Sequence, residues 1–192
     1  YELEVGIFLA EKPGNLIELS ACHNNLGLVC KTQGQISDAR KHFAASIDID
    51  TRLQDREGMA IGLNNLGELY LLEGNTEMAL TCFKRTLQIE QETGNIIGSA
   101  DALNNIGSVY YDSGNFLKSI EYFNKALQIY EKHEALYDAA MTLNNIGSAL
   151  SLLKQFDEAM LYIQKSIAIR EKSNDKLGLA NSYLKMGEVY NQ

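Results

Sequence analysis

Proline is almost missing from this sequence: Pro13 is the single one among 192 residues. The turns that join strands favour proline, so its scarcity argues against a strand-rich fold and favours helices. Hydrophobic residues make up 45% of the chain, which excludes a disordered tail and is enough for a folded core. The sequence therefore predicts an all-α protein.

Cysteine is also scarce, and none of it has the CxxC spacing. Cys22, Cys30 and Cys82 lie within predicted helices, so we interpret them as small buried apolar residues in a reducing compartment. The chain has no apolar run long enough to span a membrane and no basic-then-apolar leader. We therefore expect a cytoplasmic protein that does not contact membranes.

Clusters of lysine and arginine are missing too, and the formal net charge is -8. A nucleic-acid partner is therefore not expected. GxGxxG, Walker-type, GxSxG and HExxH motifs are absent. His23, His42 and His133 have no metal-ligand spacing, and His23 replaces a leucine at a packing position, where we expect it to be partly buried. The sequence predicts no enzyme, no catalytic residue, no cofactor and no metal site.

A period of 40 residues organises the chain. The run LNNIG occurs at 103–107 and 143–147, LNNLG at 63–67, and HNNLG at 23–27. Its glycine recurs without slippage at Gly27, Gly67, Gly107, Gly147 and Gly187. Alanine or serine follows twelve residues later, and phenylalanine or isoleucine sixteen residues later. A fixed period of this size predicts a solenoid of stacked supersecondary units.

Each unit has the sequence features of two antiparallel helices. The predicted N-caps of the first helices are Asn15, Asp55, Asn95 and Asp175, and those of the second helices are Asn75 and Asn115. Left-handed glycines are expected to end the first helices at Gly34, Gly74 and Gly114. The predicted repeats are 15–54, 55–94, 95–134 and 135–174, with the end of a preceding second helix at 1–14 and the first helix of a truncated fifth repeat at 175–192. This division gives ten helices and about 4.5 repeats in a right-handed α-solenoid.

The fourth repeat and the two ends depart from this pattern. Ala135 replaces a cap and Lys154 replaces a glycine, so we expect weaker helix ends there, by roughly 1 kcal/mol per lost cap. The chain opens and closes within a repeat and lacks polar capping repeats, which predicts a piece of a longer protein. We expect its last helix to expose Tyr183, Met186 and Tyr190, or to bury them through self-association.

Helical geometry explains the repeated asparagine motif. At about 100° per residue, one face is predicted to pack inward, with the glycine allowing close approach of the partner helix: Leu103, Ile106, Gly107 and Tyr110. The opposite side carries Asp101, Asn104, Asn105, Ser108 and Tyr111. We therefore expect both asparagines of each repeat to lie outside the packing seam. Aromatic residues three after the glycines are expected in the core: Tyr70, Tyr110 and Tyr190.

These columns resemble the tetratricopeptide repeat (TPR), because Leu–Gly, an aromatic residue, Ala and Phe recur in register along the whole chain. The common TPR has about 34 residues and a proline near its end, whereas this period is 40 and lacks the proline. The sequence is similar to the long-helix variety found in Pins-type adaptors, in kinesin light chains, which share the NNL run, and in bacterial signalling and sensor proteins, including Rap-type regulators. The resemblance implies that the first helices line a concave groove that binds a peptide or a partner segment.

Carried onto this sequence, the resemblance places a row of amides along the groove at Asn25, Asn65, Asn105 and Asn145, beside Asn24, Asn64, Asn104 and Asn144. Further candidate contacts are Glu68, Leu72, Asp101, Ser108, Tyr111, Asp112 and Ser148. The fifth repeat has Leu184 and Lys185 at the asparagine positions, so the row is expected to end there.

Asparagine suits this task because it offers two donors and one acceptor to a peptide backbone. Four such bonds supply roughly 4 kcal/mol, which is only about millimolar affinity, so pockets between repeats must add the rest. We expect a peptide partner with apolar anchors and basic residues. In an alternative interpretation, one asparagine of each pair bonds to the next helix and is structural.

The leading hypothesis is a non-catalytic protein–protein interaction module that binds a peptide or helical segment in this Asn-lined groove, as part of a larger signalling or adaptor protein. The alternative is an intramolecular regulatory or self-association scaffold of a multidomain signalling protein.

Overall fold

The computed structural model describes residues 15–191, and the chain divides into two compact units, Tyr1–Asn95 and Ile96–Gln192. Each unit is described by itself. The helix end expected at residues 1–14 lies outside the described residues.

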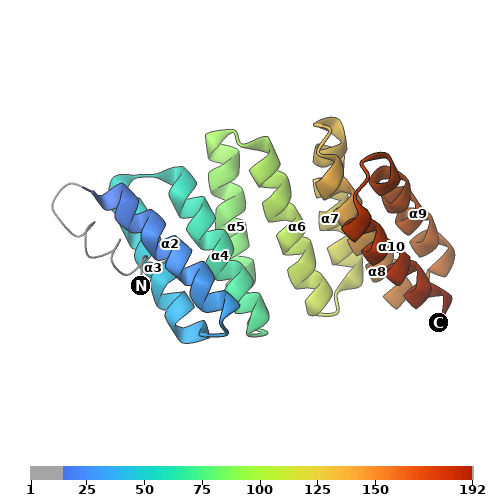
Figure 1. The fold of residues 1–192 in the computed structure, drawn as a ribbon, viewed down its shortest axis with the longest axis horizontal. Coiled ribbons are helices and arrows are strands. Elements are labelled where there is room, and N and C mark those ends of the chain that lie inside the picture. Colours follow the sequence, from blue (N-terminus) through green and yellow to red (C-terminus); the bar gives the residue numbers. More distant parts are fainter. Residues whose placement is uncertain (1–14, 192) are drawn as a thin grey trace. The chain divides into compact units, whose positions relative to one another are not determined.

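All regular structure in residues 15–191 is α-helical, as the composition predicts (Figure 1). The first unit contains α2 (Leu16–Thr32), α3 (Ile36–Leu53), α4 (Arg56–Leu72) and α5 (Thr76–Thr93). The second contains α6 (Ile96–Asp112), α7 (Phe116–Lys132), α8 (Leu136–Leu152), α9 (Phe156–Lys172) and α10 (Lys176–Tyr190). The described part of the chain holds nine helices, and the tenth predicted helix falls on residues 1–14, outside the described residues.

Within each unit, consecutive helices pack against each other, which is the arrangement of a TPR-like solenoid. Within the first unit α2 also contacts α4, and within the second α8 contacts both α6 and α10. The first helices therefore lie next to each other inside each unit. In each unit we call the surface formed by its first helices the first-helix surface: α2 and α4 in the first unit, and α6, α8 and α10 in the second.

The core lies between the first and second helix of each repeat. Phe43, Phe83 and Phe123 are at most 1% exposed. Each phenyl ring packs on the glycine sixteen residues before it; a Cβ added to Gly107 would lie 2.6 Å from Phe123 Cδ1. The prediction that this glycine allows close approach of the partner helix is confirmed.

One predicted core position is wrong. Tyr190 is 73% exposed, whereas its counterparts Tyr70 and Tyr110 are half-buried. The Tyr110 ring stacks on Tyr122 of α7 with a centroid distance of 5.4 Å. Among the described residues no helix follows α10 to cover Tyr190 in the same way, so burial at this position depends on the partner helix.

Four of the predicted N-caps are confirmed, and one is wrong. The side chains of Asp55, Asn75, Asn115 and Asp175 each accept a hydrogen bond from a backbone N–H in the first turn of their helix. Asn15 makes no such bond; its amide donates to Glu18 instead, so that predicted side-chain cap is wrong. Ala135 leaves α8 without a side-chain cap, as expected.

Lys154 occupies a left-handed backbone position with a φ of 61°, where earlier repeats have Gly34, Gly74 and Gly114. Such a φ costs a non-glycine residue about 1 kcal/mol. We expect Lys154→Gly to raise the free energy of unfolding by about 0.5–1 kcal/mol, measured by urea titration of the circular dichroism signal. The matched control, Gly114→Lys, should lower it by a similar amount. An unchanged midpoint for both variants would contradict this account.

Candidate functional site

The first asparagine of each motif turns toward the neighbouring first helix. Asn104 and Asn144 are only 7% and 4% exposed. Asn104 Oδ1 accepts a hydrogen bond from Thr142 Oγ1 at 3.2 Å, and Asn144 Nδ2 donates to Ser182 Oγ at 2.8 Å. The expectation that both asparagines of each repeat lie outside the packing seam is therefore wrong for these two. They join α6 to α8 and α8 to α10.

In the first unit, asparagines of both columns take part in the hydrogen bond that links neighbouring first helices. Asn65 Nδ2 donates to Asn24 Oδ1 at 2.8 Å, which links α4 to α2. Asn64 Nδ2 donates to Glu68 Oε1 at 2.9 Å, and Lys31 pairs with the other oxygen of Glu68 at 2.5 Å. The side chains of Asn65 and Glu68 thus already bind within the chain. Asn25 remains exposed.

In the second unit, the second asparagine of each motif is more exposed to solvent than the first. Asn105 and Asn145 are half-buried. Asn145 lines a cavity of about 170 Å³ together with four other residues proposed as contacts and with two residues that were not proposed. The four are Ser108, Tyr111, Asp112 and Ser148, and the additional two are Phe123 and Lys185. The structure therefore brings five of the predicted contact residues together in one cavity on the first-helix surface.

This cavity mixes an aromatic wall with opposite charges. Burial raises the pKa of the Tyr111 hydroxyl, although the nearby Lys185 ammonium lowers it, and burial raises the pKa of the Asp112 carboxyl. Lys185 Nζ lies 2.9 Å from Glu188. Lys185 occupies the asparagine column of the fifth repeat, where the row of amides was expected to end, and it was not among the predicted contacts.

The two remaining predicted contacts lie outside this cavity. Asp101 Oδ1 accepts a 2.6 Å hydrogen bond from the buried hydroxyl of Tyr130 on α7, so it connects α6 to the second helix of its own repeat. Burial raises the pKa of Asp101, and the Tyr130 bond lowers it. Leu72 is 66% exposed near the end of α4.

A second cavity, of about 190 Å³, opens between α2 and α4 in the first unit. Asn24 and Asn25 contribute to it, but so do Ser46 and Asp50 of the second helix α3. Burial raises the pKa of the Asp50 carboxyl, the hydroxyls of Ser20 and Ser46 lower it, and the nearby Asp55 raises it. Sequence reasoning missed Asp50, because it sought contacts on first helices alone. The sequence feature that could have indicated Asp50 is a charged residue among the core positions of α3.

Comparison with known families adds to this geometry. Residues 18–92 and 98–172 match the tetratricopeptide repeat family, and together they make up most of the chain. The chain belongs to the TPR family. Proteins built from these repeats are generally non-catalytic interaction scaffolds. Comparison with curated proteins gives no match.

Solved structures share this TPR fold. BtubC (BKLC) from P. vanneervenii is 20% identical, with a TM-score of 0.83 over 98% of this chain and 79% of that one. The signal transduction ATPase PH0952 from Pyrococcus horikoshii, which has a TPR sensor, is 15% identical, with a TM-score of 0.84 over 98% and 30% of the two chains. A Rap protein complexed with competence and sporulation factor is 17% identical, with a TM-score of 0.74 over 100% and 53%. These likenesses establish the fold.

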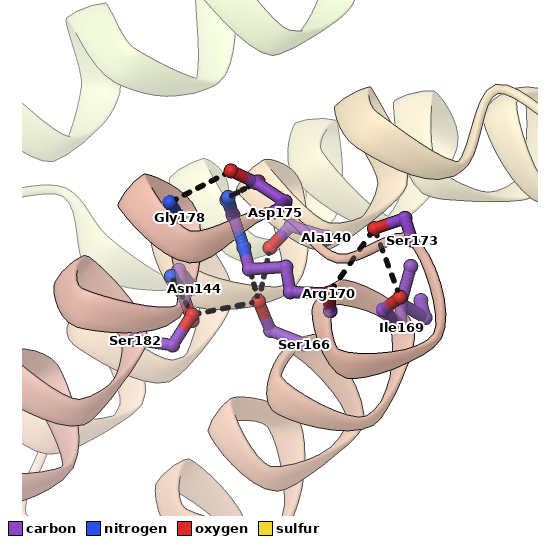
Figure 2. Close-up of polar contacts among 9 residues, drawn as sticks. All are labelled: Ala140, Asn144, Ser166, Ile169, Arg170, Ser173, Asp175, Gly178 and Ser182. Atoms are coloured by element: carbon purple, nitrogen blue, oxygen red, sulfur yellow. Dashed lines mark hydrogen bonds and ion pairs between the residues drawn. The ribbon is translucent and has the colours of Figure 1, made fainter.

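A buried polar cluster joins the last TPR helix to its neighbours (Figure 2). Arg170 of α9 is 4% exposed; its Nε donates to Ser166 Oγ at 3.2 Å, and one terminal nitrogen lies 2.5 Å from Asp175 Oδ2. Asp175 Oδ1 also caps α10 by accepting from Gly178 N–H at 2.9 Å. Ser182 continues the cluster to Asn144 and Ser166. The guanidinium thus has carboxylate and hydroxyl partners inside the protein.

The histidines and cysteines of this TPR protein all lie within residues 15–191. His23 Nδ1 lies 3.0 Å from His42 Nδ1, and His23 is half-buried as expected. Cys30 and Cys82 are buried, whereas Cys22 is only half-buried, and all three thiols are free. Across residues 15–191 no group of three or more metal-ligating side chains meets, and no helix there is sufficiently long and apolar to cross a bilayer.

Proposed function

We propose that this TPR protein is a non-catalytic interaction module that binds a peptide segment of a partner protein on its first-helix surface. The observation that carries the proposal is the cavity of the second unit, which is lined by Asn145, Ser108, Tyr111, Asp112 and Ser148. It offers amide, hydroxyl and carboxylate groups to a peptide backbone and an aromatic wall to an apolar side chain.

Fewer asparagines belong to the proposed binding surface than the sequence suggested. Asn104 and Asn144 are buried and bonded to neighbouring helices, so we assign them to the packing of the solenoid. Asn105 and Asn145 remain the proposed peptide contacts. The fold relatives support peptide binding as a class of function, since one of them is a Rap protein in complex with competence and sporulation factor. A role in signalling or as an adaptor belongs to the same proposal.

A second candidate function is self-association or binding to another part of a longer chain. The exposed apolar residues of α10 favour it: Leu177, Leu184 and Tyr190 are 85%, 62% and 73% exposed. Light scattering coupled to size-exclusion chromatography separates the two candidates, because concentration-dependent dimers support self-association and a monomer supports the peptide-binding surface.

The test of the peptide proposal uses random dodecapeptides displayed on phage, selected on the protein, followed by fluorescence anisotropy with a selected peptide. We expect the double variant Asn105→Ala/Asn145→Ala to bind that peptide about tenfold more weakly, since each lost hydrogen bond contributes about 0.5–1.5 kcal/mol. Its helical circular dichroism should be unchanged.

The matched control is Asn124→Ala, which removes an amide from the second helix α7 rather than from the first-helix surface. It should bind the peptide like wild type. Equal affinities for the double variant and wild type would show that the asparagines take no part in binding. Loss of helicity in the double variant would instead assign them to the solenoid.

A further inference from the structure

One column of the repeat puts a polar residue near the end of every second helix. At steps of 40 residues it reads Asp50, Glu90, Tyr130 and Arg170. Asp50, Tyr130 and Arg170 are 1–4% exposed. Tyr130 donates to Asp101, and Arg170 binds Asp175 and Ser166. This column therefore carries buried polar side chains whose partners are other residues of the solenoid.

The Arg170 junction has a counterpart one hundred and twenty residues earlier that keeps the serine, the capping aspartate and the glycine but has neither the cation nor an equivalent of Ser182. Ser46, Asp50, Asp55 and Gly58 occupy the positions of Ser166, Arg170, Asp175 and Gly178. Asp55 Oδ1 accepts from Gly58 N–H at 3.0 Å, as Asp175 does from Gly178. Where the later junction has a guanidinium, the earlier one has a second carboxylate.

This earlier junction carries two acids that pair with no cation among residues 15–191. Asp50 is 3% exposed, and its carboxylate receives only a long 3.4 Å bond from Ser46 together with the Ser20 hydroxyl. Among residues 15–191 no lysine, arginine or histidine pairs with Asp50 or Asp55. A buried carboxylate without a cation is unfavourable, and the raised pKa of Asp50 expresses that cost.

Both carboxylates line the 190 Å³ cavity between α2 and α4, which opens on the first-helix surface. Its rim is apolar, with Ile17 and Ile61 exposed at 69% and 48%. Asn24 and Asn25 also line the cavity with their amide side chains. An acidic floor beneath an aliphatic rim matches a long side chain with a methylene stem and a cationic head.

We propose that this cavity binds an arginine side chain of a partner polypeptide, with its guanidinium at Asp50 and Asp55 and its stem between Ile17 and Ile61. Arginine fits better than lysine, because a planar guanidinium can donate to two carboxylates and an amide at once. The same protein uses that group at the equivalent position of its fourth repeat. The inference rests on the proposed function in that the arginine belongs to the bound peptide.

The experiment titrates the ¹⁵N-labelled protein with N-acetyl-arginine amide and, separately, with the neutral near-isostere N-acetyl-citrulline amide. Because Gly58 N–H donates to Asp55, its amide resonance reports on the floor of the cavity. We expect the arginine probe to shift Gly58 and Ile61 saturably in the millimolar range, and the citrulline probe to leave them in place.

Two variants test the role of Asp50. Asp50→Asn keeps the shape and removes the charge, and should weaken the arginine probe about tenfold or more. Asp50→Arg places a guanidinium beside Asp55, as Arg170 stands beside Asp175, and should abolish binding while raising the melting temperature. The matched control is Asp48→Asn, which removes an exposed carboxylate from the same helix and should bind the probe like wild type.

Three outcomes would overturn the proposal: no shift at Gly58, equal shifts with citrulline, or an Asp50→Asn variant that is folded and binds the arginine probe as well as wild type does. If Asp50→Asn does not fold, the Asp50→Arg variant decides: retained binding overturns the proposal and lost binding supports it. These readouts need no peptide, so they fail or succeed independently of the anisotropy experiment on Asn105 and Asn145.

Discussion

Replacing Asp175 by alanine is expected to release α10 from the rest of its unit. The substitution leaves the Arg170 guanidinium buried without a carboxylate and removes the N-cap of the helix. Breaking a buried ion pair by removing one partner costs about 3–5 kcal/mol, and losing a cap costs about 1 kcal/mol more.

The helix α10 has little else to hold it. Its buried residues are Gly178, Ser182 and Val189, and of these only Val189 contributes a sizeable apolar side chain. Ser182 belongs to the same polar cluster, through Asn144 and Ser166 (Figure 2). Because each helix of a solenoid contacts only its near neighbours and can open locally, the loss should be local rather than global. Hydrogen exchange should show lost protection across residues 176–190, with α8 still protected.

Two variants separate the contribution of the Asp175 charge from that of its N-cap hydrogen bond. Asp175→Asn removes the charge but keeps an acceptor for Gly178 N–H, so it should release α10 less than alanine does. Adding Arg170→Met to Asp175→Asn removes the unpaired cation and should restore most of the protection. If Asp175→Ala leaves the exchange of α10 unchanged, the cluster does not hold the helix.

Gly107→Ala is expected to lower the free energy of unfolding by about 2 kcal/mol. The new Cβ would lie 2.6 and 2.7 Å from two ring carbons of Phe123, which is 1% exposed and cannot move aside. Overpacking of this kind costs about 1–3 kcal/mol, and it exceeds the helix-propensity gain of alanine over glycine, about 1 kcal/mol.

Gly187→Ala provides the matched control, because it changes the same column of the repeat where nothing lies within 4 Å of the new Cβ. This variant should be neutral or slightly more stable, since only the propensity gain remains. Urea unfolding followed by circular dichroism measures both. Equal effects at the two positions would mean that the glycine column does not reflect contact with the second helix.

Much of the fold could be read directly from residues close together in the sequence. The 40-residue period and the spacing of apolar residues predicted the paired helices, and Asp55, Asn75, Asn115 and Asp175 were recognisable as caps. The TPR resemblance was confirmed by the family match. The candidate site was predicted less completely. Ser108, Tyr111, Asp112, Asn145 and Ser148 do line one cavity, but their role in binding a partner stays a prediction.

The wrong predictions concern residues whose neighbours in space are far away in the sequence. Helical angles placed Asn104 and Asn144 outside the packing seam, yet the next first helix covers them. The same column rule placed Tyr190 in the core, where no described helix covers it. A helical wheel treats one helix and its immediate partner, and it holds no information about a third helix.

The sequence by itself determined the repeat, the helix ends and the family, because caps, left-handed glycines and apolar spacing act within one or two turns of helix. The packing of the helices decides which asparagines are buried. It also brings Arg170 to Asp175 beneath α10, and it places Asp50 and Asp55 in one cavity where no cation of residues 15–191 pairs with them. The physical reason is that burial and charge pairing depend on how neighbouring helices approach and rotate. In a repeat protein those contacts join residues about one repeat apart in the sequence. Equivalent positions of two repeats can carry opposite charges, as Asp50 and Arg170 do.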